Sequence, residues 1–177
     1  MAAPVTSIQI LKDTTQHVVI KLTGLFDGTS QEANTARIVA NGLYGAMATN
    51  GYPVANVYGG SANTPLSYYG LSVFRAWGVN SSINGTVELA WQATTPKTIM
   101  YVSGGTDYDG YANWLTIPNN AAGTAGCLGD IAVTTRGMSA NDAYTIVLEL
   151  RKDNAHYQRG QFNDPAAFNY GAYGRTT

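Results

Sequence analysis

The residues that could do chemistry in this chain are few and lie far apart. His17 stands in an alternating apolar segment, and His156 stands in the C-terminal segment. Neither belongs to a motif such as GxSxG or HExxH, so neither has an evident nucleophile or metal to serve. Cys127 is the only cysteine, which excludes an internal disulfide and a multi-cysteine metal site. A lone thiol of this kind is usually buried and inert. We therefore expect no catalytic residues and no enzymatic activity.

Two carboxylates separated by one residue, Asp107 and Asp109, lie in the glycine-bounded segment 104–110. The spacing resembles half of a calcium loop. Calcium, however, needs six or more oxygen ligands, usually with a later bidentate carboxylate, and none follows in this segment. The chain also lacks the GxxxxGK[ST] pattern that would cradle phosphates. We expect an ordinary turn here, and neither a metal nor another cofactor.

The tryptophans could form a sugar-binding site, because an exposed aromatic ring can stack on a sugar. Trp77 and Trp91 alternate with apolar residues in strand-like segments, where tryptophan usually packs in the core. A core position is therefore the prediction for both. A carbohydrate-binding module is therefore an alternative function. Replacement of Trp114 would test it.

The composition indicates contacts with other proteins. Charged residues make up 12% of the chain, against ~25% in typical soluble domains. The net charge is −1 without any basic block, which argues against a nucleic-acid partner, because phosphate binding needs clustered Lys and Arg. No apolar run approaches the ~20 residues that cross a bilayer, and the first residues do not resemble a secretory signal. We expect a soluble chain made in a cytoplasm, with no membrane partner.

Residues 128–152 carry the clearest structural pattern. Period-2 alternation predicts two paired strands, joined by a polar turn at 136–142. The apolar face of the second strand consists of Tyr144, Ile146, Leu148 and Leu150.

Shorter alternating segments predict the rest of the fold. Strands are expected at 4–11, 16–23, 35–39, 67–79, 87–92, 99–102 and 113–117, with a loop at 104–110. The Asn84-Gly85 pair predicts a hairpin, and alternation along 67–79 places Val73, Arg75 and Trp77 on one face. Short strands with turn signals between them predict an all-β chain, an antiparallel β-sandwich or jelly-roll-like single domain over residues 1–152.

Two segments lack any period. Residues 44–64 hold several tyrosines and are either a contact surface or a flap over their own domain. Residues 153–177 have evenly spread aromatics, which favours an extended C-terminal arm lying on a neighbouring molecule; a tail folded back on its own domain is the alternative. The predicted contact residues are Tyr52, Tyr58, Tyr157, Phe162, Phe168, Tyr170 and Tyr173.

Three segments together carry a family resemblance. They are LTGLFDGTSQEANTARIVANGL, LSVFRAWGVNSSINGTVELAW and GDIAVTTRGMSANDAYTIVLELRK, in that order. They resemble a group of virion structural proteins of tailed bacteriophages, notably those that infect marine bacteria. The resemblance covers residues 20–152 and implies a β-rich particle component without enzymatic activity. It does not fix the position in the particle.

The function expected from these observations is that of a capsid decoration or cement protein. Its partners would be the major capsid protein or other virion proteins, and further copies of itself in a homo-oligomer. It would be located in the virion, assembled in the host cytoplasm. The alternatives are a neck or tail component and the carbohydrate-binding module.

Overall fold

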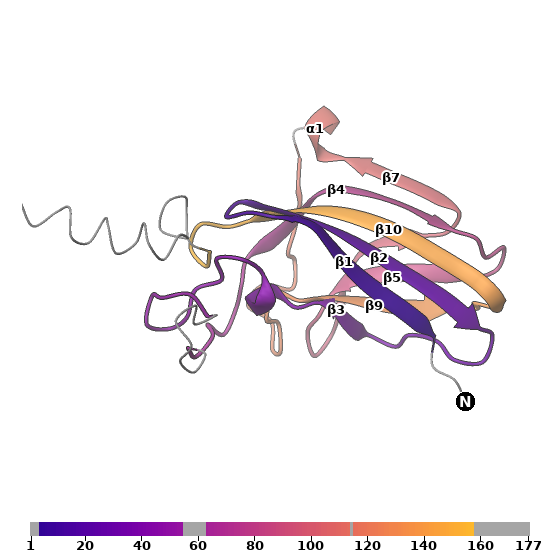
Figure 1. The fold of residues 1–177 in the computed structure, drawn as a ribbon, viewed down its shortest axis with the longest axis horizontal. Coiled ribbons are helices and arrows are strands. Elements are labelled where there is room, and N and C mark those ends of the chain that lie inside the picture. Colours follow the sequence, from indigo (N-terminus) through magenta and orange to yellow (C-terminus); the bar gives the residue numbers. More distant parts are fainter. Residues whose placement is uncertain (1–3, 55–62, 114, 158–177) are drawn as a thin grey trace, which may run out of the picture.

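The computed structural model describes residues 4–54, 63–113 and 115–157, and it is all-β, as predicted. Two antiparallel sheets face each other (Figure 1). The first has the order β1-β2-β10-β4-β7, with β8 also pairing with β4: β1 (Val5–Asp13), β2 (His17–Asp27), β4 (Leu71–Asn80), β7 (Gly105–Asp109), β8 (Ile117–Pro118) and β10 (Ala140–Lys152). The second has the order β3-β9-β5-β6: β3 (Thr35–Ile38), β9 (Ile131–Arg136), β5 (Thr86–Trp91) and β6 (Lys97–Val102). Both sheets have open edges, and jelly-roll connectivity stays a prediction.

The core lies between the two sheets and is built mainly from one face of β2, β4, β5, β9 and β10. The predicted apolar face of β10 is confirmed, because its four residues are at most 2% exposed. Residues from β2, β5 and β9 meet them, since alternate side chains of a strand share a face. The fully buried members from these three strands are Val18, Ile20, Leu22, Val87, Leu89, Trp91, Ile131 and Val133.

The two predicted hairpins, at Asn84-Gly85 and over residues 128–152, are wrong. β9 pairs with β3 and β5, whereas β10 pairs with β2 and β4, so the turn after Arg136 crosses from one sheet to the other. The Asn84-Gly85 turn likewise connects β4 of the first sheet with β5 of the second. In each case the apolar faces of the two strands meet across the core. Alternation identifies a strand's buried face, but it does not identify the neighbour to which the strand is hydrogen-bonded.

A one-residue bulge in β4 decides where its side chains point. Val73 and Arg75 pair with the adjacent residues Leu150 and Glu149 of β10, so Phe74 is the additional residue of β4. Beyond a bulge the faces exchange. Val73 is therefore buried, but Trp77 is 40% exposed on the outer face, and the prediction of a core Trp77 is wrong. Trp91 is confirmed in the core, at 0% exposure.

Further differences concern short elements. The segment predicted as a loop at 104–110 contains β7, which adds an edge strand to β4. The strand predicted at 113–117 is reduced to β8, after a single turn of helix α1 (Gly110–Asn113). A short 3-10 helix, η1 (Ala40–Gly42), follows β3. Among the residues with described structure, no helix is long and apolar enough to cross a membrane.

Candidate binding surfaces

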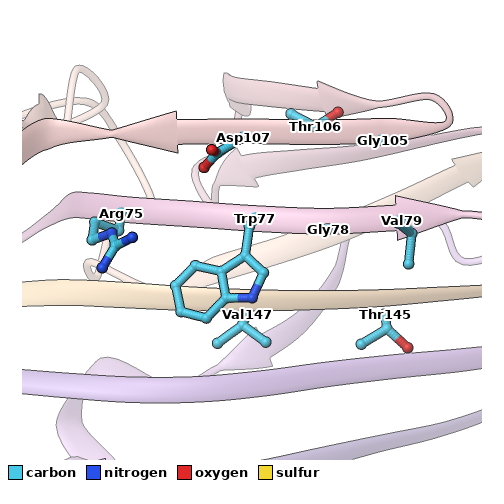
Figure 2. Close-up of a pocket in the computed structure, with 9 residues that line it drawn as sticks. All are labelled: Arg75, Trp77, Gly78, Val79, Gly105, Thr106, Asp107, Thr145 and Val147. Carbon is cyan, nitrogen blue, oxygen red and sulfur yellow. The ribbon is translucent and has the colours of Figure 1, made fainter. Parts of the chain in front are cut away.

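The outer face of the first sheet carries a shallow hollow around Trp77 (Figure 2). Its volume is about 600 Å³. The strands β4, β7 and β10 supply its lining. The lining residues, together called the Trp77 hollow, are Arg75, Trp77, Gly78, Val79, Gly105, Thr106, Asp107, Thr145 and Val147.

Strand register places the indole of Trp77 at the centre of this hollow. Trp77 pairs with Val147 of β10 on one side and with Asp107 of β7 on the other. Figure 2 shows the indole lying toward β10, above Val147. Val147 is 8% exposed although it belongs to the outer face. The ring therefore rests on the sheet and does not extend freely into solvent.

Arg75 is held beside the indole by several partners. Its guanidinium carbon lies 5.5 Å from the centroid of the Trp77 ring and 5.7 Å from that of Tyr111. Its Nε lies 3.6 Å from a carboxylate oxygen of Asp109. Tyr111 in turn donates a 3.4 Å hydrogen bond to Glu149, and desolvation together with this carboxylate raises the pKa of the Tyr111 phenol. The arginine side chain is thus positioned by aromatic and acidic neighbours at once.

The charges around the indole do not form a basic patch. Asp107 and Asp109 of β7 and Glu149 of β10 contribute three carboxylates to this outer face. Arg75, Lys21, which pairs with Val147 from β2, and Arg151, two residues after Glu149 on β10, contribute three cations. A phosphate or another strong anion would therefore meet no excess of positive charge here.

A second surface is the open edge of β1, a strand that pairs with β2 alone within the described part of the chain. It carries apolar side chains in solvent: Val5 is 71%, Ile8 45% and Ile10 53% exposed. We call this surface the β1 edge. Tyr44 extends it, because its backbone N–H donates to Asp13 at the end of β1 over 2.8 Å, and its side chain is 48% exposed.

The segment 44–64 shows features of both expected alternatives. Ala46 and Ala48 are buried, so this part of the segment packs on its own domain as a flap does. Tyr52, a predicted contact residue, is 50% exposed, as a contact surface requires. Tyr58 and Trp114 lie outside the described residues.

Lys152 fixes the end of β10 and the start of the C-terminal segment. Its side chain is 0% exposed. The ammonium donates to a carboxylate oxygen of Asp13, to the Thr14 carbonyl at 2.8 Å and to the Tyr44 carbonyl at 2.7 Å. Burial lowers the pKa of Lys152, and the Asp13 carboxylate opposes that shift. All three N–H groups of the ammonium are thus paired.

Tyr157 corrects the predicted start of the arm. It is 1% exposed, and its hydroxyl donates a 2.9 Å hydrogen bond to the Ala40 carbonyl. Residues 153–157 are therefore part of the domain, and Tyr157 is a core residue and not a surface contact. Its ring packs 5.6 Å from that of Tyr69, which explains its burial. The remaining predicted contacts, Phe162, Phe168, Tyr170 and Tyr173, lie outside the described residues.

Sequence reasoning missed a buried polar cluster. The Glu32 carboxylate, 3% exposed, accepts hydrogen bonds from the Tyr144 hydroxyl at 2.7 Å and the Arg37 guanidinium at 2.6 Å. Burial, and then the Glu32 charge, raise the pKa of Tyr144. The Glu32 backbone N–H donates to the hydroxyl of Thr135 in β9, and the Glu32 carbonyl accepts from the Thr135 N–H, so the cluster joins both sheets. The segment is charged and polar, and no periodicity marks it as buried.

Among the residues that can be placed, both histidines lie beside carboxylates and the cysteine lies beside an amide. His156 pairs with Asp153 at 2.7 Å, whereas the nearest polar partner of the buried Cys127 thiol is the Asn119 amide at 3.7 Å. His17 lies 3.7 Å from Glu149 on the outer face. Over the same residues, no group of three potential metal ligands comes together.

Comparisons of the chain with protein-family models, with curated proteins and with solved structures find no match. We therefore infer function from this chain's own residues.

Proposed function

We propose that the chain is a structural protein of a tailed-bacteriophage virion, and specifically a capsid decoration or cement protein. The sequence resemblance described above supports this proposal. The structural observation that carries it is the β1 edge, where Val5, Ile8 and Ile10 stand in solvent along an open strand. Soluble proteins usually protect such edges with charges, coverage or very short strands. In a chain with only 12% charged residues, an apolar edge of this length favours an assembled state.

The proposed mechanism is multivalent burial without chemistry. The β1 edge would accept a strand or an apolar surface of a neighbouring subunit. Residues 158–177 would act as an arm that adds aromatic contacts, and twenty residues can reach up to ~70 Å when extended. Each contact can be weak, because a lattice repeats it many times. We also propose that the strands of the two sheets are connected as in a jelly roll.

Particle binding tests the β1 edge. Co-sedimentation with virions that lack the protein would compare the wild type with the double variant Ile8→Lys/Ile10→Lys. Both side chains are already exposed, so the variant should fold, but the added charges should prevent strand pairing and abolish retention on particles. Ile83→Lys is the matched control, since Ile83 is 97% exposed in the β4–β5 turn. Wild-type retention of the double variant would contradict the proposal for this surface.

Truncation after Tyr157 tests the arm separately. It preserves the Lys152 and Tyr157 contacts, which a cut after Asp153 would partly remove. We expect unchanged stability and at least a tenfold loss of particle affinity. Full retention would remove the arm from the mechanism. A copy number per particle too small to cover a head would support a neck or tail position instead.

A further inference from the structure

We infer that the Trp77 hollow is a binding site for neutral carbohydrate, in which the C–H face of one hexopyranose unit stacks on the Trp77 indole. Such a site does not depend on the role proposed above, because a virion protein and a protein of another kind could equally carry it. Three features support it: the position of the indole, the polar groups around it and their charge balance (Figure 2).

The indole is placed for stacking before any ligand arrives. The bulge at Phe74 turns Trp77 outward, where it is 40% exposed. The ring rests above Val147, and the Arg75 guanidinium lies 5.5 Å from its centroid. A ring held in this way loses little side-chain entropy on binding, which is the main cost of using a flexible contact. An exposed, fixed indole also offers the largest aromatic surface among the side chains.

The polar groups next to the indole match the hydroxyl groups of a sugar. Arg75 provides donors, Asp107 provides acceptors, and the hydroxyl of Thr145 provides both. Within the described part of the chain, neither the Trp77 indole N–H nor the exposed Asp107 carboxylate has a hydrogen-bond partner. A sugar hydroxyl can donate to one carboxylate and accept from a guanidinium or an indole N–H. A hollow with one aromatic platform and a few converging polar groups is typical of small-ligand sites.

The same residues disfavour other classes of ligand. Asp109 lies 3.6 Å from Arg75 and offsets its charge, and Asp107 and Glu149 add further negative charge, so phosphates and nucleic acids are poorly matched. A protein-docking surface would be expected to show a contiguous apolar patch. Here the exposed apolar residues Trp77 and Val79 are flanked by charged and hydroxyl side chains.

The test is binding of the full-length protein to an array of neutral oligosaccharides of glucose, galactose, mannose and N-acetylhexosamines. Multivalent display on the array compensates for weak single-site affinity. The best glycan is then titrated in solution, with tryptophan fluorescence as the readout. Trp91 is 0% exposed, so it should not respond to direct ligand contact. We expect a saturable change in the emission of an exposed indole.

Matched variants separate the site from the fold. Trp77→Ala should weaken binding at least tenfold and Asp107→Ala severalfold, while Trp77→Tyr, which keeps an aromatic platform, should retain part of the affinity. Tyr101→Ala is the control, since Tyr101 is an even more exposed aromatic (56%) on β6 of the other sheet. Circular dichroism confirms that each variant is folded. The inference is overturned if no neutral glycan binds, if binding survives Trp77→Ala, or if only acidic glycans or a virion protein bind through Trp77.

Discussion

At the scale of single residues, Lys152 is a buried charge whose desolvation the fold has to compensate. A buried ammonium loses its hydration, and only good geometry compensates for that loss. Three acceptors provide it: the Asp13 carboxylate and the carbonyls of Thr14 and Tyr44. The centroid of the Tyr157 ring lies 5.1 Å from the ammonium nitrogen, which adds a cation–π contact. One charge thereby joins the β1–β2 turn, the 44–64 segment and the end of β10.

Replacement of this charge is expected to be costly. Lys152→Met should lower the free energy of unfolding by about 3–5 kcal/mol, because it leaves the Asp13 carboxylate and two carbonyls without their buried donor. Urea denaturation measures the change. Lys97→Met, at a less buried position on β6, is the control and should change stability by less than ~0.5 kcal/mol. Equal stability of the two variants would mean that Lys152 does not hold the β1–β2 turn, the 44–64 segment and the end of β10 together.

At the scale of elements, the loop that enters β9 passes unusually close to the chain before β4. Tyr69 donates its backbone N–H to the Leu128 carbonyl at 2.9 Å. Gly129 has a φ of +99°, and a Cβ there would lie 2.0 Å from the Tyr69 carbonyl oxygen. Only glycine permits both the backbone conformation and the approach. This contact sets how the loop reaches the second sheet.

Two glycine substitutions distinguish close approach from backbone strain. Gly129→Ala should destabilise the fold by more than ~3 kcal/mol, because the clash with backbone adds to the strain of a left-handed alanine. Gly123 has a φ of +79°, but a Cβ added there would meet no atom of the described residues within 4 Å, so Gly123→Ala should cost only the strain, ~1 kcal/mol. Thermal unfolding compares them. Similar losses would show that the approach to Tyr69 is not tight.

Element identity was more predictable than element pairing. Alternation located the buried face of β10 and the core position of Trp91. Alternation could not reveal that β9 and β10 belong to different sheets, because both choices bury the same residues. It also could not reveal the bulge at Phe74, because a bulged residue need not be of any particular type and so leaves no mark in the sequence. The Trp77 hollow was missed for that reason.

At the scale of the whole molecule, one core receives tyrosines from distant parts of the chain. Tyr144 comes from β10, and Tyr157 from the segment after it, yet both belong to the same buried cluster. Burial raises the pKa of each phenol, and the nearby charges of Glu32 and Asp153 respectively raise it further. Ionisation of either hydroxyl is therefore strongly disfavoured while the core stays closed. The protonation of these two groups depends on the integrity of the complete two-sheet structure.

Alkaline titration tests this coupling. Because the folded-state pKa of both tyrosines lies above the ordinary value of 10.0, their contribution to stability is fully present below pH 10 and is lost as the pH rises above it. Tyrosinate absorbance should show Tyr144 and Tyr157 ionising cooperatively, above the ordinary pKa of a tyrosine and together with the loss of the β-sheet circular dichroism signal. Ionisation of all the tyrosines before any loss of that signal would show that the core admits water locally and that the two sheets do not unfold as one unit.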